Sequence, residues 1–345
     1  MLRKRRPRFR TARAALAGLA FALAGCARVA ADASVHPLDL SMIASVPLPG
    51  AATRFDYASL DPVTHRLFVA HLAASEVVVF DVATDRVVGR IPDVSEVHGV
   101  LAVPQLGRLY ATATGTNEVV AIDARSLHVI ARMPGGSYPD GMAYDPADHK
   151  LFVSDENGDT DTVIDTRTNA RIATIPLGGD VGNTQYDART RRAYVNDQTH
   201  GDLIAIDPTS DTIVARYHLS GCAGNHGLAI DDRTRRAYIA CEDDARLVVF
   251  DFATMTQTQT LPLGSGPDVL ARDPDLARLY VASESGVVSI FSTRGARVRE
   301  TSHAYLAENA HVVAVDPRTH RVYFPVLSPT GPRMLVMMPS PRRPQ

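Results

Sequence analysis

Tryptophan is absent from this 345-residue sequence, and only three cysteines are present. The apolar run at residues 14–25 is shorter than the roughly 20 residues that a helix needs to cross a bilayer. The chain also lacks a glycine-rich phosphate loop, a P-loop lysine motif and a nucleophile elbow. These absences argue against a helical membrane domain, the common phosphate-binding motifs and an α/β-hydrolase site.

What the sequence does contain is an internal repeat. One aromatic column recurs with spacings of 42, 42, 42, 44, 42 and 43 residues, at Phe68, Tyr110, Phe152, Tyr194, Tyr238, Tyr280 and Tyr323. Such a fixed period indicates a repeat architecture, and seven copies predict seven structural units.

Each repeat reads as four short strands joined by turns. A turn and an apolar strand are visible in "DPVTHRLFVA" at 61–70 and "DDRTRRAYIA" at 231–240, and a further strand in "VVVFD" at 77–81. Helical periodicity is missing, so the pattern predicts an all-β fold, a seven-bladed β-propeller of four-stranded antiparallel blades. The WD40 and kelch repeat types are excluded because there is no tryptophan.

The two ends of the chain predict how the ring closes. The last repeat has only three strands, and residues 38–48 supply an unassigned strand, "LDLSMIASVPL". We therefore expect the N-terminal strand to complete the last blade, which removes an exposed sheet edge. This places the propeller at residues 38–338 and a polar tail at 339–345.

The N-terminus resembles an export signal. Seven basic residues precede the apolar run, which ends in Leu-Ala-Gly-Cys at 23–26. The motif resembles a lipobox, which predicts a lipoprotein signal peptide at 1–25, lipidation of Cys26 and a linker at 26–37. Ordinary cleavage after Ala33 is the alternative. We expect a periplasmic or outer-membrane lipoprotein that is attached to the membrane only by its N-terminal lipid.

Export changes the charge and the cysteine chemistry. Loss of residues 1–25 leaves 29 Lys and Arg against 38 Asp and Glu, a formal charge of −9. With no interleaving of basic and aromatic residues, we expect no nucleic acid partner. In an oxidising compartment Cys222 and Cys241 are expected to form a disulfide, with two free buried thiols as the alternative.

The repeat itself resembles a known family. The strands "RLYVA", "RAYVN" and "RAYIA", followed by "VID" and "IPLGG", are similar to the YVTN-repeat, YncE-like propellers of bacterial surfaces and periplasm. The resemblance covers residues 38–338 and implies the fold, while it says little about chemistry. The absence of tryptophan weighs against a quinone-dependent dehydrogenase.

Candidate functional residues are those that differ between blades at the mouth of the channel. Aspartates that recur at the turns of most blades, such as Asp61 and Asp81, are interpreted as structural. The residues expected on a ligand-binding rim are Asp56, Tyr57, His98, Asp140, Asn183, Gln185, Asn225, His226, Asp268 and His311. The loop after the second strand should bring His71, Asp155, Glu156, Asp197, Glu242, Asp243 and Glu284 to the same face.

Two functions are compatible with such a rim. The first is a binding or scaffold protein of the cell envelope that holds a small ligand or a partner protein. The second is a metal-dependent hydrolase or lyase, resembling propeller lactonases or streptogramin lyases, with one divalent metal ion held by His98, His226, His311 and Glu242. In that case His226, His311 and Glu242 are the catalytic candidates. The alternative for these side chains is a polar, water-filled channel.

Overall fold

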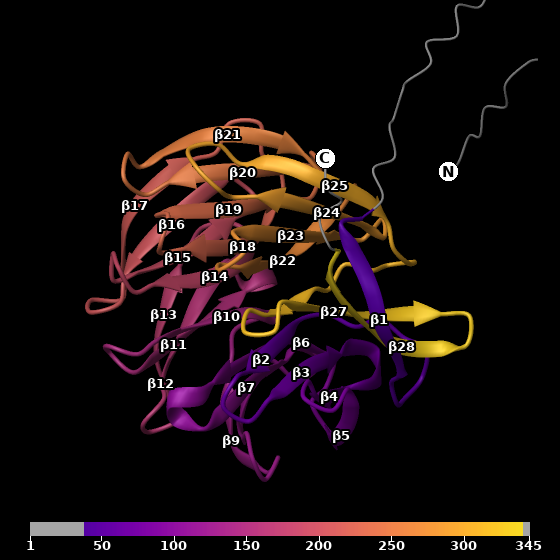
Figure 1. The fold of residues 1–345 in the computed structure, drawn as a ribbon. Helices are drawn as coiled ribbons and strands as arrows, with labels where there is room; N and C mark the ends of the chain where they lie inside the picture. Colours follow the sequence, from indigo (N-terminus) through magenta and orange to yellow (C-terminus); the bar gives the residue numbers. More distant parts are fainter. Residues whose placement is uncertain (1–37, 341–345) are drawn as a thin grey trace, which may run out of the picture. The chain divides into compact units, whose positions relative to one another are not determined.

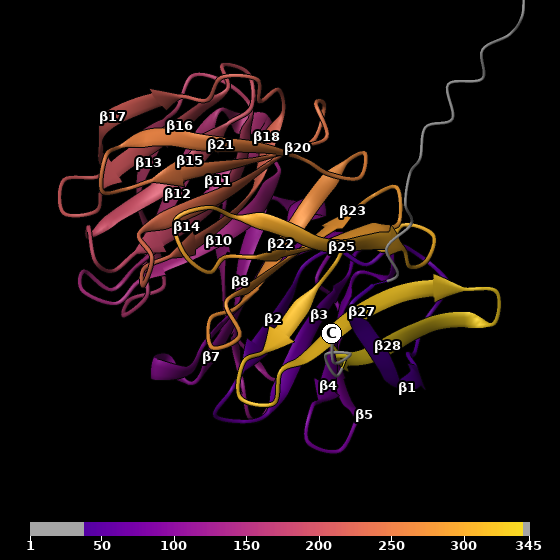
Figure 2. The ribbon, with the colours of Figure 1, turned by 45° about the horizontal axis from the view of Figure 1, so that its top comes forward.

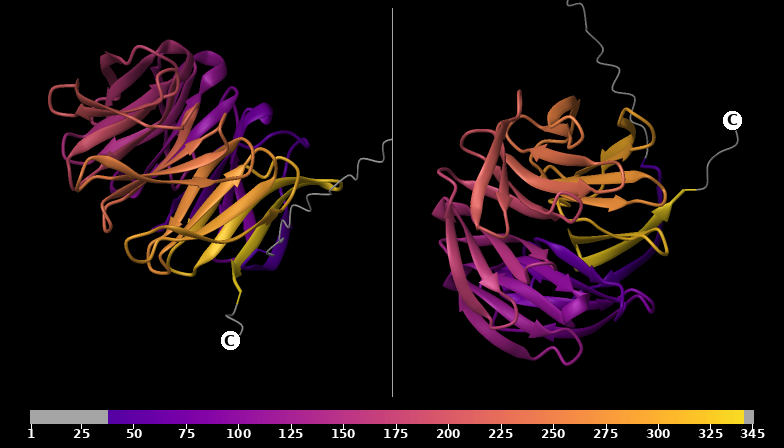
Figure 3. Two further views of the ribbon diagram at one scale, coloured as in Figure 1. Left: turned by 90° about the horizontal axis from the view of Figure 1, so that it is seen from above. Right: turned by 90° about the vertical axis from the view of Figure 1, so that its left-hand side faces the viewer.

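The computed structural model describes residues 38–340, which form seven four-stranded antiparallel sheets arranged in a ring (Figure 1). The predicted all-β, seven-bladed propeller is confirmed. Figure 2 and Figure 3 show the same blades from three further directions.

Blades are numbered along the chain, and strands are given from the channel outwards. Blade 1 consists of β2 (Ala58–Asp61), β3 (Arg66–His71), β4 (Glu76–Asp81) and β5 (Arg86–Ile91). Blade 2 consists of β6 (Val97–Val103), β7 (Arg108–Ala113), β8 (Glu118–Asp123) and β9 (Val129–Pro134). Blade 3 consists of β10 (Pro139–Asp145), β11 (Lys150–Asp155), β12 (Thr160–Asp165) and β13 (Ala170–Pro176). Blade 4 consists of β14 (Val181–Asp187), β15 (Arg192–Asp197), β16 (Asp202–Asp207) and β17 (Thr212–His218).

Blade 5 consists of β18 (Asn225–Asp231), β19 (Arg236–Cys241), β20 (Arg246–Asp251) and β21 (Thr256–Pro262). Blade 6 consists of β22 (Pro267–Asp273), β23 (Arg278–Ser283), β24 (Val287–Ser292) and β25 (Arg299–Tyr305). Blade 7 consists of β26 (Ala314–Asp316), β27 (Arg321–Ser328), β28 (Gly331–Pro339) and β1 (Leu40–Pro47). Between residues 38 and 340, the helical segments are the short 3-10 turns η1 (Leu72–Ala74), η2 (Pro104–Leu106), η3 (Thr114–Thr116) and η4 (Glu156–Gly158).

The position of a strand within its blade determines its burial. The second and third strands, such as β3 and β4, are buried along nearly their whole length because neighbouring blades cover both faces. The outer strands, such as β17, alternate between exposed and half-buried residues. The repeating aromatic column lies in the second strand, and Tyr110, Tyr238 and Tyr323 are fully buried. The hydrophobic core therefore lies between the blades.

The N-terminal strand closes the ring, in agreement with the prediction. β1 pairs antiparallel with β28, from Leu40 opposite Pro339 to Pro47 opposite Arg333 (Figure 2). Leu48 continues the contact by donating its backbone N–H to the carbonyl of Pro332 at 2.9 Å. The outermost strand of blade 7 thus comes from the opposite end of the chain.

A basic residue opens the second strand of every blade, and it links most blades to the next. The column consists of Arg66, Arg108, Lys150, Arg192, Arg236, Arg278 and Arg321. In six blades the side chain donates hydrogen bonds to the following blade. Lys150 shows the pattern clearly: its Nζ donates to the carbonyl of Pro208 at 2.7 Å and pairs with Asp211 at 2.8 Å. Arg192 is the exception, since it pairs with Asp207 of its own blade.

Blade 5 contains the predicted disulfide. Cys222 and Cys241 are bonded, with their Cα atoms 5.1 Å apart and 19 residues apart in sequence. Cys241 ends β19 and lies opposite Asn225, the first residue of β18. The disulfide therefore ties the loop that enters blade 5 to the strand beside it.

Some expectations lie outside the described residues. The signal peptide at 1–25, the linker at 26–37, the lipidated Cys26 and residues 341–345 of the polar tail belong to this group. Within residues 38–340, no helix combines the length and apolar character needed to span a membrane.

Candidate functional site: an acid–imidazole ring in the channel

A β-bulge at the start of the inner strands presents the site residues to the channel. Pairing with the second strand is interrupted at the same place in five blades, for example between Val97 and Val100 of β6 and between Pro139 and Met142 of β10. A bulge breaks the two-residue alternation of a strand and re-aims a side chain. The equivalent position in blades 1 to 7 is occupied by Asp56, His98, Asp140, Gly182, His226, Asp268 and His311.

The six side chains at this position form a chain of alternating carboxylates and imidazoles, which we name the acid–imidazole ring. His226 Nε2 lies 3.4 Å from Asp140 Oδ2, and its Nδ1 lies 3.4 Å from Asp268 Oδ1. The remaining contacts join His311 Nε2 to Asp268 at 3.9 Å and to Asp56 at 3.5 Å, and His98 Nε2 to Asp56 at 3.9 Å. All six residues are at most 9% exposed.

Glycines next to the ring let the inner strands approach each other closely. A Cβ at Gly99 would collide with the backbone carbonyl of Asp140, and one at Gly227 with that of Asp268. Gly182 occupies the ring position of blade 4, where a Cβ would meet the backbone of His226 at 2.7 Å. Because Gly182 has no side chain, His226 of blade 5 reaches across to Asp140 of blade 3.

Burial and the alternation of charge shift the pKa values of the ring in opposite directions. Burial lowers the pKa of His226, but the facing Asp140 and Asp268 outweigh it and hold that pKa well above its usual value. Burial also acts to lower the pKa of His311, yet Asp56 and Asp268 leave it raised. Burial acts to raise the pKa of Asp268, but His226 outweighs it and the pKa falls below its usual value.

His98 is held by hydrogen bonds at both ring nitrogens. His98 Nδ1 lies 2.8 Å from the backbone carbonyl of Glu96, so Nδ1 carries a hydrogen and donates it. His98 Nε2 lies 2.9 Å from the hydroxyl of Tyr138. These two hydrogen bonds fix the orientation of the His98 ring, with Tyr138 at its Nε2 edge.

Above the ring lies a vestibule of about 500 Å³. Seven carboxylates line it, those of Asp56, Glu96, Asp140, Glu156, Glu242, Asp268 and Glu284. Burial, offset in part by His226, raises the pKa of Glu242 to about 7. Arg54 is the one arginine among the lining residues, and no lysine is among them. The lining therefore holds more carboxylates than cationic side chains, which are Arg54 and His226.

Arg54 neutralises only one side of this vestibule. Its guanidinium lies 3.6 Å from Asp56 Oδ1 and 3.9 Å from Asp268 Oδ2, and it also pairs with Glu284. Asp140 and Glu156 have no such partner among the arginines and lysines of the described residues. Pairing with arginine is thus confined to Asp56, Asp268 and Glu284, and the cationic group nearest to Asp140 is His226, at 3.4 Å.

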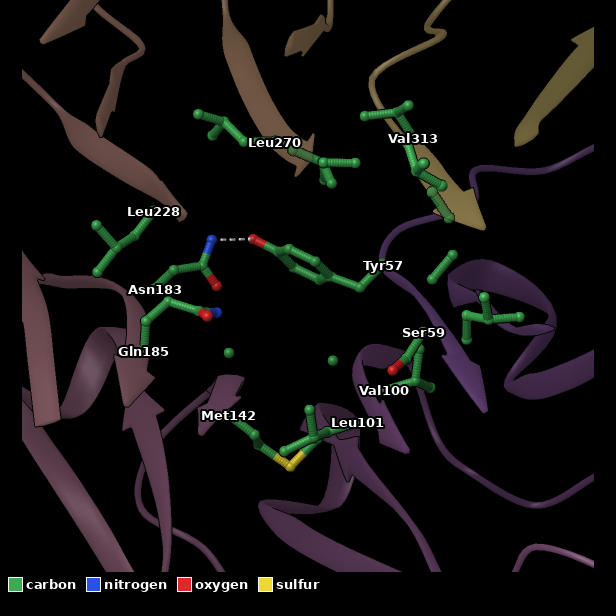
Figure 4. Close-up of a pocket in the computed structure, with 18 of the residues that line it drawn as sticks. Tyr57, Ser59, Val100, Leu101, Met142, Asn183, Gln185, Leu228, Leu270 and Val313 are labelled. Atoms are coloured by element: carbon green, nitrogen blue, oxygen red, sulfur yellow. Dashed lines mark hydrogen bonds between the residues drawn. The ribbon is translucent and has the colours of Figure 1, made fainter. Parts of the chain in front are cut away.

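Tyr57 forms the floor of the vestibule. Its hydroxyl accepts a hydrogen bond from Asn183 Nδ2 at 2.7 Å and lies 3.5 Å from Asp268 Oδ1, so the side chain spans the channel (Figure 4). Beneath it lies a second cavity of about 260 Å³, whose wall includes Leu228, Leu270 and Val313. The channel is divided into a charged upper part and a more apolar lower part.

The structure sorts the ten predicted rim residues. Asp56, Tyr57, His98, Asp140, His226 and Asp268 line the vestibule, and His311 contacts them from within the ring. Asn183 lies beneath Tyr57, and Gln185 lines only the lower cavity. Asn225 is fully buried, where its amide donates to the carbonyl of Asp202 and to Asn196. Asn183, Gln185 and Asn225 are therefore not among the residues that line the vestibule.

The four predicted metal ligands do not share one centre. Among the described residues, the groups with metal-ligand spacing are Asp56–Asp268–His311, Asp140–Glu156–His226 and His226–Glu242–Asp268. No group contains two histidines, and His98 belongs to none. A carboxylate separates each imidazole from the next, so a site with several histidine ligands is not formed.

The loops after the second strands contribute fewer site residues than expected. Glu156, Glu242 and Glu284 line the vestibule. His71, Asp155 and Asp197 are fully buried and bond to their own surroundings, as when Asp155 accepts from the hydroxyls of Thr160 and Thr162. The prediction did not select Arg54 or Tyr138 as site residues, although Arg54 directly precedes Phe55 and Asp56 at the channel mouth.

Comparisons with known proteins show a similarity of fold and do not identify a function. The sequence matches no protein-family model, and no curated protein matches it. Among solved structures it is similar to a chain of hydrazine synthase from Kuenenia stuttgartiensis, at 15% identity and a TM-score of 0.71, over 84% of this chain and 95% of the other. A chain of a mitotic checkpoint complex gives 14% identity, a TM-score of 0.74 and coverages of 94% and 99%. A streptogramin B lyase gives 12% identity and a TM-score of 0.72, over 86% of this chain and 97% of the other.

Proposed function

We propose that this protein is an exported ligand-binding propeller of the YVTN-repeat type, and that its vestibule holds a small cationic ligand above the acid–imidazole ring. The observation that carries the proposal is the lining of the vestibule, where seven carboxylates outnumber the two cationic groups, Arg54 and His226. Like charges in a confined, low-dielectric space attract a counter-charge strongly. A ligand with an amine or guanidine group supplies it.

The size of the vestibule supports a small occupant. A volume of about 500 Å³ lies within the range of small-molecule sites and is too small for a folded partner. It accommodates an organic cation or a single basic side chain from an envelope protein. Tyr57 closes the floor, which gives the ligand an aromatic ring as well as carboxylates, and aromatic faces attract cations.

The proposed location rests on other features. The basic and apolar pattern of residues 1–25 supports export, and the Leu-Ala-Gly-Cys motif supports a lipid on Cys26. The Cys222–Cys241 disulfide fits an oxidising compartment such as the periplasm.

A matched ligand panel tests the binding function. Thermal unfolding of the protein is measured in metal-free buffer with amines, guanidines, neutral isosteres and carboxylates of similar size. We expect only the cations to raise the melting temperature. The variant Glu242→Gln should weaken the best cation about tenfold or more, because one charge-assisted hydrogen bond contributes about 1.5–3 kcal/mol.

The control for this panel is Asp232→Asn. Asp232 is exposed in the turn at the other end of β18, so its loss should leave ligand affinity unchanged. Stabilisation by anions, or equal affinity in Glu242→Gln and the unmodified protein, would contradict the proposed function.

A second function is favoured by one observation, the presence of three groups with metal-ligand spacing around the ring. A metal-dependent hydrolase or lyase would use one of these groups, with His226 or His311 and Glu242 as the residues that bind metal or transfer protons. Hydrolysis of a panel of lactones and esters, with and without added Zn²⁺, tests this activity. Turnover that disappears in His226→Ala would support an enzyme over a binding protein.

A further inference from the structure

Asp140 is the least satisfied polar side chain of the ring. It is only 2% exposed, and both of its carboxylate oxygens lack a hydrogen-bond partner. The nearest opposite charge is His226 Nε2, at 3.4 Å from Oδ2. Leaving a buried carboxylate without donors costs several kcal/mol, so a missing partner is expected at this place.

Two further ligand atoms face the same place. Glu156, which begins η4, and His226 Nε2 lie with Asp140 in one group whose donor atoms are all within 4.8 Å of one another. Glu156 is held by its backbone N–H, which donates to the carbonyl of Tyr138 at 2.9 Å. These atoms come from blades 3 and 5, and the empty ring position at Gly182 leaves the space between them.

The second nitrogen of His226 is arranged as in metal sites. Its Nδ1 lies 3.4 Å from Asp268 Oδ1, while Nε2 faces Asp140. A histidine that binds a metal usually directs its other nitrogen at a carboxylate, which orients the ring and strengthens its basicity. Asp268 therefore positions His226 for a ligand at Nε2.

The other two groups are less suitable because their charge is already balanced. Arg54 contacts both Asp56 and Asp268, and Asp268 belongs to each of the other groups. His311, in the group with Asp56, is 1% exposed and has no opening to the vestibule lining. Of the three groups, Asp140–Glu156–His226 is the one in which neither carboxylate has an arginine or lysine partner among the described residues, and both Asp140 and Glu156 line the vestibule.

We propose that Asp140, Glu156 and His226 bind one divalent metal ion of the Zn²⁺ or Mn²⁺ type. Two carboxylates and one imidazole are a donor set that both ions accept. Three protein ligands leave at least one coordination position, and it opens into the vestibule. The metal site does not depend on the proposed organic cation, whose proposed partner is Glu242 of blade 5.

Titration with Zn²⁺ alone tests this proposal. The untagged protein is treated with chelator, dialysed and titrated by calorimetry, with no organic ligand present, and Co²⁺ is used in parallel for its absorption spectrum. We expect one equivalent to bind the unmodified protein. Asp140→Asn and Glu156→Gln should each weaken binding about tenfold or more, since each removes one anionic ligand.

Two further variants separate a ligand from the general field of the vestibule. Glu284→Gln removes a vestibule carboxylate that pairs with Arg54, and we expect less than about a threefold loss of Zn²⁺ affinity at moderate salt. Asp232→Asn should leave it unchanged. Thermal unfolding without metal shows whether each variant is folded.

Three results would overturn the metal site: no stoichiometric Zn²⁺ in the unmodified protein, unchanged affinity in folded Asp140→Asn, or equal losses in Glu284→Gln and Glu156→Gln. Failure of the metal site leaves the cation panel intact, because that panel is measured without metal. Failure of the panel with a positive Zn²⁺ titration would favour the enzyme over the binding protein.

Discussion

The Cys222–Cys241 disulfide is expected to stabilise the fold by an amount that can be worked out from its position. The two cysteines lie 19 residues apart. Cross-linking a loop of this length removes about 11 cal/mol/K of entropy from the unfolded chain, which is about 3 kcal/mol at 25 °C. An ordered region of about 300 residues unfolds with an entropy of about 0.6 kcal/mol/K, so we expect reduction to lower the melting temperature by about 5 °C.

The assay is thermal unfolding with and without a reductant in a Cys26→Ser background, which removes the only other cysteine. The control is the double variant Cys222→Ala, Cys241→Ala, which should no longer respond to the reductant. Its melting temperature should lie slightly below that of the reduced protein, because Cys241 is fully buried and its sulfur fills space in the core of blade 5.

Two results would refute this reasoning. A shift below about 1 °C on confirmed reduction would mean that the segment is already constrained in the unfolded chain or strained by the bond. A double variant that still responds to the reductant would show that the effect does not come from the disulfide.

Three other perturbations test the fold. Deletion of residues 38–48 should lower the unfolding free energy by more than about 4 kcal/mol, because burial of the Leu40 and Leu48 side chains contributes about 2 kcal/mol each. Deletion of 341–345 should have little effect in the same denaturant titration. Lys150→Ala should cost about 1–2 kcal/mol in chemical unfolding, since it removes a mostly buried ion pair with the next blade. Burial and the nearby Asp155 raise the pKa of Asp161 well above its usual value, so Asp161 contributes less to stability as pH rises above that usual value. The variant Asp161→Asn should therefore gain stability relative to the unmodified protein between pH 5 and pH 8. A constant difference in unfolding free energy between the two proteins across that range would contradict this prediction.

The fold was predictable because its signals repeat. The aromatic column from Phe68 to Tyr323 recurs in every blade, and the three strands of the last repeat left one place for residues 38–48. The basic column that begins at Arg66 was equally regular, and it was missed because a charged residue next to a turn is usually interpreted as solvent-exposed.

The site was less predictable because β-bulges break the alternation of the inner strands. Asn225 and His226 are adjacent, and in the sequence both were interpreted as rim residues, but the bulge directs only His226 to the ring. In blade 4 the ring position is Gly182, which carries no side chain, so the sequence drew attention to the neighbouring Asn183 and Gln185 instead. A two-residue period cannot be followed through a bulge without the register.

The grouping of metal ligands failed for a related reason. Histidines attract attention as ligands, and the three of the ring come from well-separated blades. Which side chains are neighbours depends on blade order, and that order places a carboxylate between each pair of imidazoles. Glu156 was on the expected face but was not selected, because nothing in its local sequence distinguishes it from the other acidic loop residues.

The pairing of β1 with β28 sets a condition on how the polypeptide reaches its native state. Leu40 and Pro339 are neighbours in the sheet although almost the whole chain lies between them. During synthesis the first strand has no partner until the last one emerges, so the ring cannot lock while the chain is still being made. The ring can therefore close only after the C-terminal strand is available, so we expect formation of blade 7 to be a late step that follows release of the whole chain.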